Sequence, residues 1–189
     1  MKARRKKLIK AALFDFGDLI IVEIHDQKSM ATWESYPIVK GMDKVVTELA
    51  KDYKLAVVSN TFTSTRETLD MILTKVGLRP YFLYITTSVD VGKRKPAPEI
   101  FLEALDVLGA KPHEAVMIGD RTETDIRGAN ALGIHSILFR WRDKYPDTSG
   151  DSPDDRPQFR AKRAEDLLRI FKRHFHPPGL HSAAPHSRA

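Results

Sequence analysis

Short apolar runs alternate along this chain with longer segments in which apolar residues recur every three or four positions. The runs are rich in aliphatic residues and each ends at a turn-like or polar residue, which predicts strands over residues 8–16, 55–59, 82–86, 115–119 and 135–139. The segments between them have the period of a helix, which predicts helices over residues 43–52, 63–76, 98–108 and 123–132.

This alternation of strands and helices indicates an α/β fold, with a doubly wound parallel sheet covered by helices on both faces. Gly77, Gly109 and Gly133 each follow the end of a predicted helix, where glycine is a common stop signal. In such sheets ligands bind beyond the carboxyl ends of the strands. We therefore expect the chemistry of the protein to lie in the residues directly after each apolar run.

The character of the chain changes after Trp141. Residues 144–158 are rich in Asp, Pro, Ser and Gly, which predicts a loop. A short amphipathic helix follows, with Ala164, Leu167 and Phe171 on one face. From residue 176 the chain is rich in Pro, His, Ser and Ala, and we expect residues 176–189 to form a disordered tail.

Composition places the chain among ordinary globular proteins. It has 189 residues, of which 42% are hydrophobic and 30% charged, enough for one domain with a sizeable core. No apolar run approaches the roughly 18 residues of a membrane span, and no signal-peptide pattern follows the basic N-terminus, so we expect a cytoplasmic protein. Without cysteine, any metal must be bound by oxygen atoms or histidines.

The net charge of +6 comes largely from a basic arm over residues 1–7 and a second basic region over residues 156–173. Such clusters can neutralise nucleic-acid phosphates. A solvated tail and the polar face of a last helix are the more usual explanation of such charge runs. Because no aromatic residues alternate with these charges in a stacking pattern, we do not expect a nucleic-acid partner. The lack of a long apolar run predicts that the protein has no membrane partner.

Two of the predicted strands end in side chains suited to phosphate chemistry. Asp15 closes the first, and a carboxylate fixed there can attack phosphorus to form an acyl phosphate. Ser59 and Asn60 close the second, where a hydroxyl and successive backbone N–H groups can hold phosphate oxygens beside a helix N-terminus. Taken singly, Asp15 is more often a turn-capping residue, and Ser59 and Asn60 are equally consistent with a helix cap.

A lysine and two further carboxylates complete the candidate chemistry. Lys95 precedes a Pro-x-Pro segment and can neutralise both an attacking carboxylate and a phosphate, although a solvated lysine is the ordinary alternative. Asp120 ends the fourth predicted strand and Asp125 falls in the first turn of the next helix. These two can converge on Mg²⁺, which prefers oxygen ligands, or can simply favour the helix N-terminus.

In this order and at these positions, the four segments resemble the four motifs of the haloacid dehalogenase superfamily, from about residue 8 to residue 171. The resemblance is closest at Lys95-Pro96 and over residues 111–129. It implies that Asp15 is the nucleophile, that Lys95 is the charge-neutralising catalytic lysine, and that Ser59, Asn60 and Lys95 bind phosphate. Its implied magnesium ligands are Asp15, the backbone carbonyl of Gly17, Asp120 and Asp125.

The resemblance also implies a Rossmann-like sheet in the order 5-4-1-2-3 and phosphatase activity. On this basis residues 8–175 are the catalytic domain, between the basic arm and the tail. Residues 21–40 are too few for a large cap domain and are expected to be a minimal cap or linker. The site should then be open, which suits a phosphorylated macromolecule, or a phosphorylated small molecule covered by a neighbouring subunit of an oligomer.

One position departs from the family pattern. Related phosphatases carry a second aspartate two residues after the nucleophile, as general acid and base, and here that residue is Gly17. Loss of such a group typically costs about 100- to 10,000-fold in rate. Asp18, Glu23 and His25 follow in the next loop and are the candidates to replace it.

Three hypotheses follow from these patterns. The first is a magnesium-dependent phosphohydrolase, a phosphomonoesterase acting through an aspartyl-phosphate on Asp15. The second is a catalytically weakened binding or regulatory module of the same family, indicated by Gly17. The third is a phosphoacceptor receiver domain, which is disfavoured because such domains have no counterpart to the segment from Gly119 to Asp125.

Overall fold

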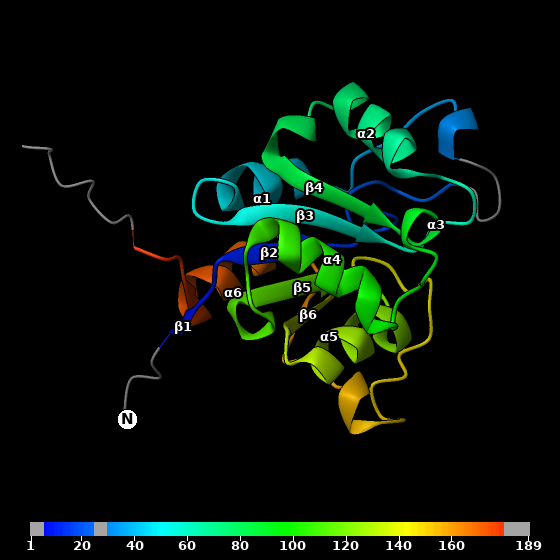
Figure 1. Ribbon diagram of the computed structural model, residues 1–189. Helices are drawn as coiled ribbons and strands as arrows, with labels where there is room; N and C mark the ends of the chain where they lie inside the picture. Colours follow the sequence, from blue (N-terminus) through cyan, green and yellow to red (C-terminus); the bar gives the residue numbers. More distant parts are fainter. Residues whose placement is uncertain (1–5, 25–29, 180–189) are drawn as a thin grey trace, which may run out of the picture.

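A parallel sheet of six strands forms the centre of the protein (Figure 1). The computed structural model describes residues 6–24 and 30–179. In spatial order the strands are β4 (Phe82–Thr87), β3 (Lys54–Ser59), β2 (Ala11–Phe14), β5 (Ala115–Gly119), β6 (His135–Phe139) and β7 (Phe159–Ala161), and every neighbouring pair is parallel. The predicted order 5-4-1-2-3 is confirmed, with β7 added beyond the fifth strand.

Helices cover both faces of this sheet, as predicted. One face carries α1 (Met42–Leu49), α2 (Arg66–Lys75) and α6 (Ala164–His174); the other carries α4 (Pro98–Leu108) and α5 (Arg127–Leu132), and the single turn α3 (Ser88–Val91) follows β4. Within the described ranges, no helix has the length and apolarity that crossing a membrane requires.

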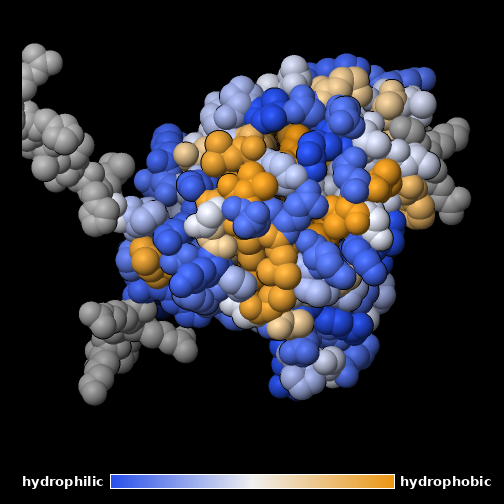
Figure 2. All heavy atoms as spheres, viewed as in Figure 1, coloured by the Kyte–Doolittle hydropathy of each residue, from blue (hydrophilic) through white to orange (hydrophobic). Residues whose placement is uncertain are grey.

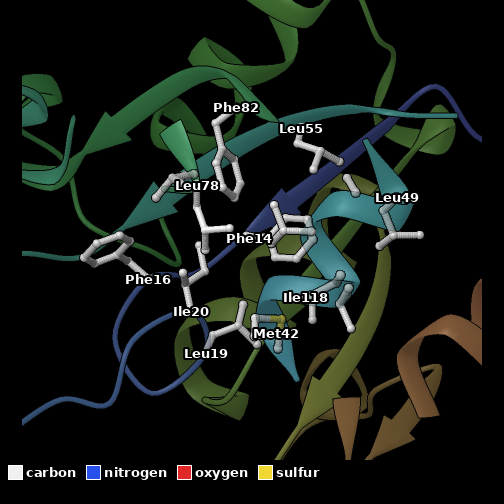
Figure 3. Close-up of a cluster of buried hydrophobic side chains, with 14 of the residues drawn as sticks. Phe14, Phe16, Leu19, Ile20, Met42, Leu49, Leu55, Leu78, Phe82 and Ile118 are labelled. Atoms are coloured by element: carbon white, nitrogen blue, oxygen red, sulfur yellow. The ribbon is translucent and has the colours of Figure 1, made fainter. Parts of the chain in front are cut away.

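The alternation of side chains along β2 builds the two cores. Ala12 and Phe14 belong to the core under α1, α2 and α6, whereas Ala11 and Leu13 belong to the core under α4. Phe14 meets the ring of Phe82 edge-on at 5.7 Å, in the buried cluster that Figure 3 shows. Because both faces of β2 are buried, its carboxyl end is held firmly at the edge where Asp15 lies.

Short turns complete the described chain. They are η1 (Met30–Thr32), η2 (Arg79–Tyr81), η3 (Pro112–Glu114), a π-helical turn η4 (Thr122–Ile126) and η5 (Pro153–Asp155). Between β2 and α1, the described residues contain the one turn η1 and no cap domain. Ile21 forms isolated bridges to Gly17 and to Ile38, so this segment folds back over the end of β2.

The first predicted strand is split in the structure. Its start forms β1 (Lys7–Leu8), which pairs in parallel with β8 (Phe175–His176), whereas the central sheet takes only Ala11–Phe14. The Ile9 N–H donates to the His176 carbonyl and the next N–H, of Lys10, donates to the Glu114 carbonyl. The backbone therefore changes partner within two residues, which an unbroken apolar run does not reveal.

Other boundaries also differ from the prediction. The second helix begins at Arg66 rather than at residue 63, since Thr65 is extended and precedes the first helical turn. The helix predicted over residues 123–132 begins as the π-turn η4 and continues as α5. His176, placed in the predicted tail, lies in β8; residues 180–189 and residues 1–5 of the arm are outside the described residues.

Candidate active site

Lys95 lies at the centre of a buried cluster of charges at the carboxyl edge of the sheet. Its ammonium group is 2.7 Å from Asp15 Oδ1 and 2.6 Å from Asp125 Oδ1, and it also donates to the Val58 carbonyl at 2.7 Å. Burial disfavours the charged lysine, but the charges of Asp125 and Asp15 outweigh that cost and raise the pKa of Lys95. The lysine is therefore a permanent cation between two carboxylates.

Asn60 fixes the backbone of Lys95. Its side-chain oxygen accepts from the Lys95 N–H at 2.7 Å, and its side-chain nitrogen donates to the Lys95 carbonyl at 3.0 Å. Both polar atoms of the amide are thus engaged in positioning the lysine. Asn60 also lines the pocket, where its backbone N–H and the second N–H of its amide are the donors it could offer a phosphate.

Asp15, Asp120 and Asp125 form a carboxylate trio with one oxygen from each within 4.8 Å of the others. Asp15 and Asp120 follow directly after β2 and β5, neighbours in the sheet, while η4 returns Asp125 to the same place. Gly119 makes this return possible, because a Cβ atom there would stand only 2.3 Å from the Asp125 carboxylate.

The trio fits a hard divalent cation. Asp120 Oδ1 is buried without a hydrogen-bond partner, and burial, together with Asp15 and Asp125, raises the pKa of Asp120 well above its usual range. Burial raises the pKa of Asp125 to about 6, although Lys95 acts in the opposite direction. The three carboxylates carry more negative charge than one lysine can neutralise. Converging carboxylate oxygens of this kind are the donors that Mg²⁺ binds.

A pocket of about 210 Å³ opens beside the trio. The predicted residues Asp15, Gly17, Ser59, Asn60, Lys95 and Asp120 all line it, and Asp125 lies behind Lys95. Ser59 ends β3 and is 2% exposed. Residues that the sequence motifs did not indicate also line it: Met30, Phe62, Arg94, Arg121, Thr124, Lys144 and Tyr145.

Lys144 and Tyr145 belong to the segment predicted to be a loop. They follow β6, whose carboxyl end lies at the same edge of the sheet, so the strand-end rule applied to the fifth run would have indicated this region. Lys144 lies 2.6 Å from Glu23 Oε2 and 3.0 Å from Asp18 Oδ2. Burial opposes its charge, but the hydrogen bonds to Glu23, Tyr145 and Asp18 prevail and raise the pKa of Lys144.

The three candidates to replace the missing acid differ in position. Asp18 is 2% exposed and pairs with Arg142 and Lys144, away from the pocket lining. Glu23 lines the pocket, and its carboxyl carbon is 3.5 Å from the place of a Cβ on Gly17. His25 lies outside the described residues.

Comparison with known proteins agrees with this fold. Residues 13–139 match the family described as haloacid dehalogenase-like hydrolase. The chain is 36% identical to pyrophosphatase PpaX of Bacillus pumilus over 77% of its own length and 63% of that protein's. It is 41% identical to the glyceraldehyde 3-phosphate phosphatase of Methanopyrus kandleri over 53% of its own length and 42% of that protein's.

A solved structure extends the likeness to most of the fold. The crystal structure of an uncharacterized protein from Listeria monocytogenes serotype 4b aligns with 87% of this chain and 99% of its own, with a TM-score of 0.68 and 27% identity. The chain spans about half the length of the two phosphatases named above. With its sheet order, its strand-end carboxylates and the match over residues 13–139, the chain belongs to the haloacid dehalogenase-like hydrolases.

Proposed function

We propose that the protein is a magnesium-dependent phosphohydrolase that acts on phosphate monoesters through an aspartyl-phosphate on Asp15. The observation that carries this proposal is the position of Lys95, which bridges Asp15 and Asp125 from a fully buried position at the edge of the pocket. A lysine held there lowers the repulsion between an attacking carboxylate and an incoming phosphate. The phosphatases among the relatives support the same reaction class.

In this proposal Asp15 attacks phosphorus, the bond to the leaving oxygen breaks, and water then splits the aspartyl-phosphate. Ser59 and Lys95 bind the phosphoryl oxygens, together with the backbone at Asn60. Asp15, the Gly17 carbonyl, Asp120 and Asp125 would hold Mg²⁺, which when bound neutralises charge on the phosphoryl group.

The substrate class follows from the pocket. About 210 Å³ accommodates a phosphoryl group with part of a small alcohol, and no cap domain covers it in the described residues. A phosphorylated small molecule, or an exposed phosphate on a macromolecule, therefore fits the site. Oligomerisation and a cytoplasmic location stay predictions. The side chains of Leu102 and Val107 in α4 are exposed. Figure 2 shows apolar surface over the region of α4, which a neighbouring subunit could cover.

A weakened binding module is the second candidate, favoured by the absence of a carboxylate at Gly17. A phosphatase assay with Mg²⁺, small phosphomonoesters and a phosphopeptide separates the two. We expect hydrolysis that is lost on chelation and in Asp15→Asn, but retained in Asp52→Asn, the same change at an exposed position at the other end of the sheet. Activity that survives chelation or Asp15→Asn would refute the mechanism, and binding of phosphate without turnover would favour the module.

A further inference from the structure

The carboxylate of Glu23 fills the space beside Gly17. A Cβ atom on Gly17 would lie 3.5 Å from both Cδ and Oε1 of Glu23, which is ordinary van der Waals contact. A side chain longer than alanine at this position would meet the Glu23 carboxylate. Related phosphatases have their second aspartate at the position of Gly17. The space that its side chain would occupy is here taken by the carboxylate of Glu23, six residues further along the chain.

Both the side chain and the backbone of Glu23 are held in place. Oε2 accepts from Lys144 at 2.6 Å and from the Tyr145 hydroxyl at 3.1 Å. The Glu23 N–H donates to Asp18 Oδ1 at 2.9 Å, and Arg142 donates to the Glu23 carbonyl at 3.1 Å. These contacts hold the Glu23 carboxyl group at the edge of the pocket, beside the place where a residue 17 side chain would lie.

The other groups near the pocket are less suited to that task. Asp18 is buried and, unlike Glu23, does not line the pocket. Burial raises the pKa of Tyr145 to about 12, so its hydroxyl keeps its proton at neutral pH. Asp120 and Asp125 are assigned to the cation. Among the described residues that line the pocket, Glu23 is the remaining carboxylate.

We propose that Glu23 is the base for the second half of the reaction, an inference that rests on the proposed function. The oxygen of a water molecule attacks the phosphorus of the aspartyl-phosphate, and the bond between phosphorus and the Asp15 oxygen breaks. The water gives one proton to the Glu23 carboxylate, Asp15 recovers its own carboxylate, and inorganic phosphate leaves. Glu23 then releases its proton to solvent.

The test follows an aryl phosphate, with the released phenolate and the protein-bound phosphate measured separately. Glu23→Gln keeps an oxygen for Lys144 and Tyr145 but removes the base. We expect one phenolate per site in a burst, phosphate retained on the protein, and steady turnover slowed by about 100-fold or more. Glu34→Gln, the same change at an exposed position in the same segment, should behave as wild type.

Relocating the carboxylate separates a chemical role from a structural one. Glu23→Ala removes the group that a residue 17 side chain would meet, and Gly17 has no positive φ that would strain a substitution. We expect the double variant Gly17→Asp/Glu23→Ala to turn over at least about tenfold faster than Glu23→Ala, because a carboxylate returns to the same place. Thermal unfolding of each variant verifies that it is folded.

The outcomes distinguish this inference from the function beneath it. Wild-type protein that releases no phenolate in an Asp15-dependent way overturns both. Asp15-dependent turnover that Glu23→Gln leaves unchanged overturns the base assignment alone. So does a Glu23→Gln variant that loses the burst itself, since the first step would then need Glu23. A folded double variant no faster than Glu23→Ala would mean that Glu23 acts by holding Lys144 and its loop.

Discussion

Replacement of Lys95 by methionine tests the charge balance on which the site depends. The side chain is 1% exposed, and its ammonium lies within 2.7 Å of Asp15 and Asp125. Methionine fills a similar space without charge and leaves two buried carboxylates unpaired. Breaking a buried ion pair in this way costs about 3–5 kcal/mol in the free energy of unfolding.

An independent argument bounds that cost. An unpaired carboxylate can escape by taking a proton, which at neutral pH costs about 1.4 kcal/mol for each unit between the pH and its unfolded pKa, or about 4 kcal/mol for each carboxylate. In the variant the pKa of Asp125, already raised to about 6, is therefore raised further above that of the unfolded chain. Stability tied to such a group is present at low pH and is lost as the pH rises, so the deficit of Lys95→Met should shrink towards about pH 5.

Urea unfolding of metal-free protein at several pH values measures this deficit. Lys93→Met is the matched control, because Lys93 is exposed and two positions away, and it should change the free energy of unfolding by less than about 0.5 kcal/mol. Protonation of Lys95 does not complicate the comparison, since its pKa is raised and it stays charged throughout. Equal destabilisation by the two variants, or a deficit independent of pH, would refute the reasoning.

Three further predictions concern the carboxylate trio, all by thermal or urea unfolding with and without Mg²⁺. Asp120→Asn should stabilise the metal-free protein, because the raised pKa of Asp120 reflects a costly buried charge, and should abolish stabilisation by Mg²⁺; an unchanged Mg²⁺ response would contradict its role as a ligand. Gly119→Ala should weaken the Mg²⁺ response too, because its Cβ would displace Asp125; a full response would show that Asp125 is not needed. Relative to Asp125→Asn, metal-free wild type should lose stability as the pH rises from 3.8 to about 6, because in that window the folded protein binds more protons at Asp125 than the unfolded chain does. A rise in this stability difference over the same window would contradict the prediction.

The convergence of Asp15, Ser59, Lys95 and Asp120 could be predicted from the sequence because it depends on topology. The carboxyl ends of parallel strands meet at one edge, so residues that follow apolar runs must lie close together there. The sheet order came from the family resemblance, and the structure confirms it. The metal and phosphate roles of these residues remain predictions for the experiments above.

What the sequence could not show is which of two polar partners a side chain takes. Asn60 at a strand end suits phosphate, yet both atoms of its amide bond to the Lys95 backbone, 35 positions away. β7 was missed for a different reason. Its three residues are too few to show an alternating pattern, and its pairing with β6 depends on neighbours rather than on its own composition.

Gly17 and Glu23 show why a motif read alone can mislead. The glycine indicates a missing acid when only its own position is considered. In the structure, the bridge between Gly17 and Ile21 turns the chain back over the strand end, and Lys144, from the loop after β6, holds the Glu23 carboxylate against the glycine. A side chain longer than alanine at position 17 would meet that carboxylate. The small residue at position 17 therefore leaves room for the distant acid at the edge of the pocket.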